Sequence, residues 1–435
     1  MLKVTKFGGS SLADARQYEK VRNIVLSDPA RRVVVVSAPG KRFKDDHKIT
    51  DLLYLCHAHL KYGVPCDTVF GLIRDRYLKI RDDLNVDIDL ESEFEALFNS
   101  LDKHTNEADL VSRGEYFSAR LMAAYLGFEF LDAAQWLRFL PDGKVDTKTS
   151  YQLLSRYADG HSVVIPGFYG AMADGRLHLF SRGGSDITGA LAAAALGADI
   201  YENWTDVSGI LMADPRIVDD PRPIERITYS ELRELSFIGA EVLHEDSVFP
   251  VREKDIPLNI RNTNQPDDPG TLISSRFEPE ESDTFLTGIA GKKGYTIIMI
   301  TKNGMSSMVG AFRQILSVFA KYNLPIAYTT SGIDCYSCIL EEKLFEPYRY
   351  AILGEIQEVM QPDDLMVSDH IAMLAVVGRN MAYHSGSSGK IFQALGEKGI
   401  NIRMISQGPE ELNIIIGVEE KDFNDAVRYL YRKFI

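Results

Sequence analysis

The segment Phe180–Leu191 restricts the possible folds of this chain more than any other stretch. An apolar, strand-like run ends in Gly183 and Gly184, and an alanine-rich helix follows. Ser185 and Asp186, both good N-cap residue types, open that helix. The order strand, glycine turn, helix brings backbone N–H groups and the positive end of a helix dipole together. This arrangement predicts an anion site in an α/β sheet.

Two charged side chains flank these glycines. The guanidinium of Arg182 can hold a carboxylate through two hydrogen bonds, and Asp186 can accept from an ammonium group. Together the two side chains suit an α-amino acid. A tight strand-to-helix turn with a capping aspartate explains the same residues without a ligand. The segment alone leaves both interpretations open.

A second segment of the same kind begins the chain. Lys3–Phe7 reads as a strand, and Gly8, Gly9 and Ser10 separate it from a helix with apolar residues at three- and four-residue spacing. Paired glycines let a phosphate approach the backbone, and Lys6 can neutralise charge that develops during phosphoryl transfer. The G-x-x-x-x-G-K-[ST] spacing of a P-loop is absent.

Three further strands are predicted at 33–36, 162–166 and 199–204. The first is a continuous β-branched run, which is typical of a strand covered on both faces. An open, largely parallel sheet places its ligands at the carboxyl ends of its strands. Thr50, at the start of a predicted helix, is a candidate cap or ligand.

Glu115 lies in a predicted helix among apolar and small residues. A buried carboxylate needs a partner. The ammonium group of a substrate, Arg113 and Arg120 are equally good candidates from this stretch alone.

Composition excludes several functions. The formal charge of −14 argues against nucleic acid or an anionic membrane as a partner. No apolar run approaches the roughly 20 residues that cross a bilayer, and the first residues lack a signal-peptide pattern. Four cysteines are too few for a disulfide scaffold, so we expect a reduced, cytoplasmic protein of two or three domains.

An internal repeat ends the chain. A shift of 76 residues lays Gly310 on Gly386 and Ile326 on Ile402, and each copy reads strand, helix, strand, strand, helix. The second copy ends without a last strand, so we expect the strand-like Leu286–Ala290 to fill that place. The predicted domains are residues 1–277, a linker 278–293 that carries this strand, a first repeat 294–369 and a second repeat 370–435.

Several motifs, in this order and spacing, resemble those of aspartokinases. They are Lys6–Ser11, Ser112–Glu115, Ser181–Asp186, Trp204–Val207, Ala213–Arg216 and Gly239–His244, and the repeats resemble ACT domains through Asn401–Ile405. The resemblance covers essentially the whole chain. It implies the amino-acid kinase fold, an α/β/α sandwich around a largely parallel sheet, followed by two ferredoxin-like βαββαβ (ACT) regulatory domains.

The resemblance implies transfer of the γ-phosphoryl group of ATP to the β-carboxylate of L-aspartate, the first step toward lysine, threonine and methionine. ATP would bring Mg²⁺ with it, and the protein would hold no metal of its own. The implied partners are aspartate, ATP, a regulatory amino acid (lysine, threonine or both) and a second copy of the chain bound through the ACT domains. Because no dehydrogenase domain follows the second repeat, we expect a monofunctional kinase.

The resemblance also implies roles for residues at matching positions. The catalytic residues would be Lys6, Arg182 and Asp186. Aspartate would contact Thr50, Glu115, Phe168, Arg182, Ser185 and Asp186. ATP would contact Lys6, Gly8, Gly9, Ser10, Thr205, Asp206 and Arg216. An effector would contact Met305, Ser307, Met308, Val309, Gly310, Ser331 and Asp334.

Two positions depart from the family pattern. Leu211 stands where many relatives have a tyrosine, and Glu241 stands where many have a lysine that reaches the phosphates. They motivate an alternative hypothesis, a catalytically silent amino-acid sensor. A second alternative is another acyl-phosphate-forming kinase, such as one that acts on glutamate.

Overall fold

The computed structural model describes residues 1–435 except 182, 240–242, 244, 278–285, 380, 382–383 and 409, and it leaves out the side chains of 245 and 246. The chain divides into two compact units. The first contains Met1–Ile210, Pro223–Tyr229 and Glu241–Glu278, and the second contains Leu211–Arg222, Ser230–Ala240 and Pro279–Ile435. Two segments that precede the predicted boundary at 277 therefore pack with the second unit.

An eight-stranded sheet forms the centre of the first unit. Its strands run in the order β11 (Arg226–Thr228), β13 (Thr271–Ser274), β12 (Leu258–Asn262), β8 (Ile200–Thr205), β1 (Lys3–Phe7), β2 (Arg31–Val36), β5 (Val163–Pro166) and β3 (Glu129–Phe130). All neighbours are parallel except β12 and β13. The largely parallel sheet is confirmed.

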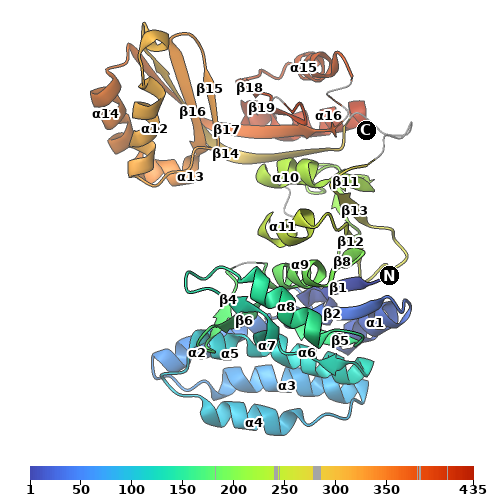
Figure 1. Cartoon of the computed structure of the whole chain (residues 1–435). Helices are drawn as coiled ribbons and strands as arrows, with labels where there is room; N and C mark the ends of the chain where they lie inside the picture. The colour runs from blue at the N-terminus through green and yellow to red at the C-terminus, as the bar shows by residue number, and fades with distance from the viewer. Residues whose placement is uncertain are drawn as a thin grey trace. The chain divides into compact units, whose positions relative to one another are not determined.

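Helices cover both faces of this sheet (Figure 1). On one face lie α1 (Ala15–Leu26) and α6 (Arg113–Leu126), backed by α2 (Ile49–Lys61), α3 (Asp67–Leu84), α4 (Leu90–Ser100) and α5 (Glu107–Val111). On the other lies α9 (Gly184–Leu196), against which α8 (Thr147–Tyr157) and α11 (Glu245–Glu253) pack. The α/β/α sandwich expected from the resemblance is confirmed.

The β-branched run of β2 explains why both faces are covered. Val33, Val34, Val35 and Val36 are all buried. Val34 and Val36 join the core formed with α1 and α6. Because successive side chains alternate across a strand, Val33 and Val35 face the α9 side.

One predicted strand lies outside the large sheet. The run before the Gly183–Gly184 turn forms β7 (Leu177–Leu179), which pairs with β6 (Tyr169–Met172). With β4 (Arg138–Phe139) these strands form a separate three-stranded sheet, and the short α7 (Ala133–Trp136) packs against β6. The strand before the Gly183–Gly184 turn therefore lies in a local, partly antiparallel sheet and not in the large one.

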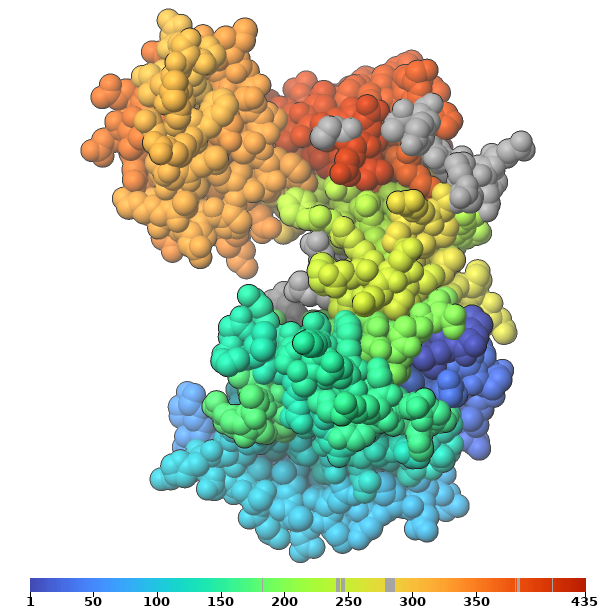
Figure 2. All heavy atoms as spheres, viewed as in Figure 1, coloured from blue at the N-terminus to red at the C-terminus, as the bar shows by residue number. Residues whose placement is uncertain are grey.

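A six-stranded sheet forms the centre of the second unit. Its order is β15 (Tyr328–Ser331), β16 (Cys335–Glu341), β14 (Gly288–Thr301), β17 (Asp364–Val377), β19 (Asn413–Glu419) and β18 (Met404–Ser406). Figure 2 shows the two repeats, orange and red, side by side in this unit. The remaining short strands are β9 (Ile210–Leu211) and β10 (Pro223–Ile224).

Both long strands, β14 and β17, belong to both repeats. The first residues of β14, Gly288–Ala290, pair with Ala375–Val377, at the place predicted for Leu286–Ala290. The register shifts between Lys292 and Ile297, and Gly294 and His370 have positive φ there. The predicted boundary at 369/370 thus falls inside one continuous strand.

Two hydrophobic cores flank this shared sheet. The core of the first repeat lies under α12 (Ala311–Lys321) and α14 (Arg349–Met360), beside α13 (Glu342–Phe345). The core of the second repeat lies under α15 (Ser387–Glu397) and α16 (Phe423–Phe434).

Within the described part of the chain, no helix is both long and apolar enough to span a membrane. All four cysteines are free.

Candidate active site

The site lies where the central parallel strands of the first unit end. β1 lies between β2, the next strand in the chain, and β8, which follows much later. Strand order changes direction at this point, where open α/β sheets bind their ligands. Of the predicted catalytic and substrate residues, Lys6 lies at the carboxyl end of β1 and Phe168 just after β5, while Thr50, Glu115, Ser185 and Asp186 lie in the first turns of α2, α6 and α9.

Lys6 and Asp186 form the central ion pair. The Lys6 Nζ lies 2.6 Å from Asp186 Oδ1, and both side chains are largely buried. The same carboxylate oxygen accepts a hydrogen bond of 2.9 Å from Asn203 Nδ2 of β8. The structure therefore brings together two predicted residues from β1 and α9 and adds a third, Asn203, that sequence reasoning missed. A polar residue within the buried β8 was the available signal.

The glycine turn before α9 differs from the expected cap. Gly183, with a left-handed φ of 59°, is the N-cap, and the helix begins at Gly184. Ser185 and Asp186 lie in the first helical turn instead, so the prediction that they cap the helix is wrong. A left-handed N-cap position favours glycine over a serine or aspartate. Arg182 lies outside the described residues.

The end of β5 packs tightly on this helix start. A Cβ on Gly167 would lie 2.6 Å from the Ser185 side chain, and one on Gly184 would lie 2.6 Å from the ring of Phe168. Phe168 has a φ of 77°, and its N–H donates to Thr188 Oγ1 over 3.1 Å. The structure thus places Phe168 and Ser185 beside the same glycine turn.

Glu115 is buried in the first turn of α6. Its Oε1 accepts a hydrogen bond of 3.1 Å from the N–H of Ala38, and among the described residues its Oε2 has no hydrogen-bond partner. Burial raises the pKa of Glu115 to about 8, although the Ala38 hydrogen bond and the charge of Lys6 oppose the shift. Glu115 is therefore a buried carboxyl group that is largely protonated at neutral pH and has one oxygen without a hydrogen-bond partner in the described part of the chain.

Neither arginine considered as a partner of Glu115 pairs with it in the structure. Arg113 donates to Ser112 Oγ and stacks on the ring of Tyr116, and Arg120 pairs with Glu93.

Thr50 lies at the start of α2, close to the same loop. The preceding Ile49 donates its N–H to Pro39 O, and the Cβ of a residue at 114 would touch Ile49, Leu53 and Ala38. The first turns of α2 and α6 therefore meet at the loop after β2. Thr50 lies in the first of these turns and Glu115 in the second.

The glycines after β1 have structural roles. The Gly8 N–H donates to Trp204 O, and a Cβ on Gly8 would lie 3.4 Å from Lys6 Nζ. A Cβ on Gly9 would lie 2.9 Å from Ala38 O. These contacts hold the loops after β1, β2 and β8 together. Ser10 lies in the short 3₁₀ helix η1 (Gly9–Leu12).

The predicted nucleotide contacts are divided between the two units. Thr205 is the last residue of β8 and Asp206 follows it, and the Thr205 hydroxyl donates to the Asp206 carboxylate. Arg216 belongs to the second unit and pairs with Asp214. Leu211 is partly exposed, and Glu241 lies outside the described residues.

The predicted effector residues surround the start of α12. Met305 is buried in the core of the first repeat, while Val309 is almost fully exposed. Gly310, with a φ of 81°, caps α12, and Asp334 accepts from the Gly304 N–H. Ser307 ends the 3₁₀ helix η2 (Met305–Ser307), Met308 packs against the same core, and Ser331 ends β15.

Comparisons with known proteins agree on one family. The model of the amino acid kinase family matches residues 1–262, and an ACT domain model matches 374–434. Aspartokinase 3 of Bacillus subtilis is 36% identical over 450 residues, which cover 100% of this chain and 98% of the relative.

Two solved structures resemble the whole chain. The aspartate kinase of Clostridium acetobutylicum is 46% identical with a TM-score of 0.92, and the match covers 100% of both chains. Aspartokinase III of Escherichia coli in complex with aspartate and ADP is 26% identical with a TM-score of 0.75, over 99% of each chain. The same enzyme in complex with lysine and aspartate has a TM-score of 0.76 at 26% identity, over 100% of this chain and 99% of the other.

Proposed function

This chain belongs to the aspartokinase family, and on that premise we propose that the residues around Lys6, Glu115 and Asp186 transfer the γ-phosphoryl group of ATP to the β-carboxylate of L-aspartate. The products are 4-phospho-L-aspartate and ADP. A carboxylate oxygen of aspartate forms a bond to the γ-phosphorus, and the bond from that phosphorus to the β–γ bridging oxygen breaks. No proton transfer is needed, because the attacking carboxylate is already ionised at neutral pH.

One observation carries this proposal. The buried pair of Lys6 and Asp186 places a cation at the carboxyl end of β1, beside the first turn of α9. Phosphoryl transfer depends mainly on positioning and on stabilising the charge of the transferred group. In our proposal Lys6 neutralises that charge, and Asp186 with Asn203 holds Lys6 in place.

Recognition of aspartate uses the remaining groups. The unpartnered Oε2 of Glu115 supports a role as the acceptor for the substrate ammonium. Ser185, Phe168 and Thr50 line the pocket in this proposal, and Arg182 holds the carboxylates by virtue of its position in the family motif.

The nucleotide enters as MgATP, so the metal arrives as part of a substrate. The one cluster of three potential metal-ligating side chains in the described residues, Glu342, His370 and Glu420, belongs to the second unit. We assign Gly8, Gly9, Ser10, Thr205 and Asp206 of the first unit to the nucleotide, and the role of Arg216 in the second unit stays a prediction from the family motif.

Regulation by an amino acid belongs to the same proposal. E. coli aspartokinase III has been solved with lysine and aspartate, and we propose that lysine, threonine or both bind this chain near the start of α12.

We also propose a homodimer through the ACT repeats, because β15 and β18 are edge strands of the six-stranded sheet of the second unit. A monomeric mass by light scattering at micromolar concentration contradicts the dimer.

The kinase proposal is tested by ADP release and hydroxylamine trapping with MgATP and either L-aspartate or L-glutamate. We expect hydroxamate with aspartate and none with glutamate. Lys6→Ala should lower kcat by about 10²–10⁴-fold, while Lys79→Ala, which removes an exposed lysine of α3, should not change it. Unchanged turnover in Lys6→Ala contradicts the assignment of Lys6, and no aspartate-dependent hydroxamate contradicts the reaction.

A further inference from the structure

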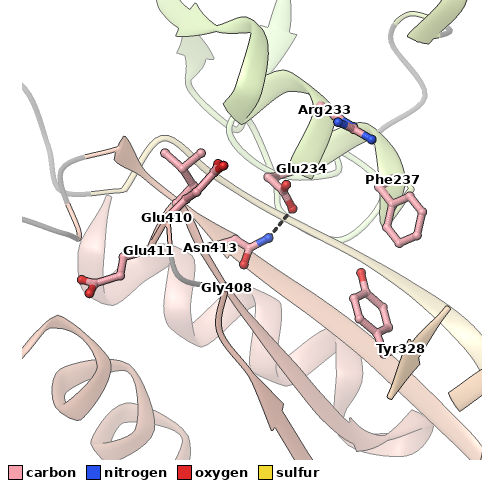
Figure 3. Close-up of a pocket in the computed structure, with 9 residues that line it drawn as sticks. Arg233, Glu234, Phe237, Tyr328, Gly408, Glu410, Glu411 and Asn413 are labelled. Atoms are coloured by element: carbon pink, nitrogen blue, oxygen red, sulfur yellow. Dashed lines mark hydrogen bonds between the residues drawn. The ribbon is translucent and has the colours of Figure 1, made fainter. Parts of the chain in front are cut away.

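A pocket of about 420 Å³ lies within the second unit, apart from every residue assigned to substrate, nucleotide or effector (Figure 3). It is bordered by α10 (Tyr229–Phe237), by β15 and by the segment that leads into β19. The volume falls within the roughly 300–1,000 Å³ of sites that bind small molecules. Its lining combines aromatic and acidic side chains with those of Arg233, Leu412 and Asn413.

The aromatic side of the pocket consists of Phe237 and Tyr328. Their ring centroids are 5.8 Å apart and their planes are perpendicular. Phe237 keeps 62% of its surface exposed although it is a large apolar residue. Figure 3 shows both rings at the same end of the pocket. The faces of such rings attract cations and pack against methylene groups.

The acidic side of the pocket contains Glu234, Glu410 and Glu411, against the single guanidinium of Arg233. Glu234 accepts a hydrogen bond from Asn413 Nδ2, which fixes its carboxylate (Figure 3). Burial raises the pKa of Glu234, the hydrogen bond from Asn413 and the charge of Arg233 oppose this rise, and the charge of Glu410 adds to it. Glu234 and Glu410 therefore repel one another, and a cation between them relieves that repulsion.

We propose that this pocket binds a small organic cation, an alkylamine or a diamine. One ammonium group is held by Glu234 and Glu410, and the methylene chain extends from it toward Phe237 and Tyr328, whose ring faces attract a second ammonium group (Figure 3). An inorganic cation does not use the aromatic rings in this way, and an anion is repelled by the carboxylates. The ligand would contact α10. This helix begins directly after β11, a strand of the eight-stranded sheet of the first unit.

The test is isothermal titration calorimetry of the full-length protein with 1,4-diaminobutane, and with succinate as an anion of matched length. Glu234→Gln removes the charge but keeps an oxygen that accepts from Asn413, and Phe237→Ala removes an exposed ring. Glu358→Gln and Tyr350→Ala are matched controls, because both side chains are exposed on α14.

We expect 1,4-diaminobutane to bind and succinate not to bind. Each pocket variant should weaken the amine by about tenfold or more, and the controls should stay within about twofold. Hydrogen exchange of residues 229–237 should slow when the amine is added to the wild type, a readout that does not depend on how the variants fold. The proposal is overturned if the amine gives no binding, if succinate binds as tightly, or if both pocket variants bind like the wild type.

Discussion

Lys6 Nζ lies 2.6 Å from Asp186 Oδ1, and Asn203 Nδ2 donates to that same oxygen over 2.9 Å. The Asp186 carboxylate therefore positions the lysine, and the Asn203 amide orients that carboxylate. The three residues come from β1, α9 and β8, so the geometry of the pair depends on the packing of the whole sheet against α9. This dependence makes Asp186 a sensitive probe of how the site is positioned.

We predict that Asp186→Asn lowers kcat by about 10–10³-fold. The substitution keeps the side-chain shape but leaves Lys6 buried without its counter-charge, which displaces the ammonium from its position. Steady-state kinetics with MgATP and aspartate measure the loss. Asp83→Asn, at an exposed ion pair of α3, is the matched control and should retain full activity. A wild-type kcat in Asp186→Asn contradicts a role for this carboxylate.

Glu115 predicts a pH dependence of stability. Its pKa is about 8 in the folded protein against 4.5 in the unfolded chain. Below pH 4.5 the carboxyl is neutral in both states, and as the pH rises toward 8 only the unfolded state ionises freely. The wild type therefore loses stability relative to Glu115→Gln over this range, by at most about 5 kcal/mol.

Calorimetric melting from pH 5 to 8.5 measures this difference. We expect the melting temperature of Glu115→Gln to rise relative to the wild type as the pH increases. Glu95→Gln, at an exposed position of α4, should follow the wild type at every pH. A constant difference between Glu115→Gln and the wild type contradicts the raised pKa.

The same carboxylate predicts a pH dependence of aspartate binding. If the ionised form of Glu115 accepts the substrate ammonium, the free protein must release a proton before aspartate binds below pH 8. The KM for aspartate should then rise by up to about tenfold for each pH unit below 8, while Glu115→Gln should show a high KM with no such slope. Initial rates between pH 6 and 8.5 distinguish the two. A wild-type KM that stays flat across this range rules out the assignment.

The elements that carry the site were largely predictable because their signals are local. Lys6 and Asp186 each lie beside a pair of glycines, and the buried run of β2 identifies a central strand. The contact between the two side chains was not predictable from spacing, because they lie on separate elements and meet only through packing. Asn203 was missed for the same reason, since its role exists only relative to Asp186.

The largest difference concerns β14 and β17. The repeat pattern predicts separate strands in two domains, yet each of these strands continues through both repeats. A sequence repeat indicates which side chains are buried in each copy. It does not indicate whether a strand of one copy continues directly into a strand of the other. The left-handed backbone at Gly294 and His370 allows the bend at which the register shifts.

The close packing of Gly167 against Ser185 leads to a prediction about aspartate kinetics. Gly167→Ala places a Cβ 2.6 Å from Ser185, so the first turn of α9 must move away. We expect kcat/KM for aspartate to fall by about 10–100-fold, because small displacements of reacting groups cost that much. Gly71→Ala is the matched control. Nothing lies within 4 Å of a Cβ at this position of α3, and alanine there should stabilise the helix by about 0.5–1 kcal/mol with unchanged kinetics.

The last prediction concerns Glu231, a fully buried carboxylate of α10. It accepts hydrogen bonds from the Thr287 hydroxyl and from Arg379, through the backbone N–H at 3.0 Å and Nη1 at 3.3 Å. These bonds attach α10 to the residues that precede β14 and follow β17. Glu231→Ala removes the acceptor of several buried donors, and such a loss typically destabilises by about 3–5 kcal/mol.

Hydrogen exchange followed by mass spectrometry locates this effect within the chain. We expect faster exchange in peptides of α10, of β14 and of the end of β17 in Glu231→Ala, with a smaller change in Glu231→Gln, which keeps an acceptor oxygen. Glu358→Gln, on the exposed face of α14, should exchange like the wild type. Unchanged exchange in β14 would mean that α10 is held by its apolar contacts, such as Leu235 against Gly288, rather than by the buried carboxylate.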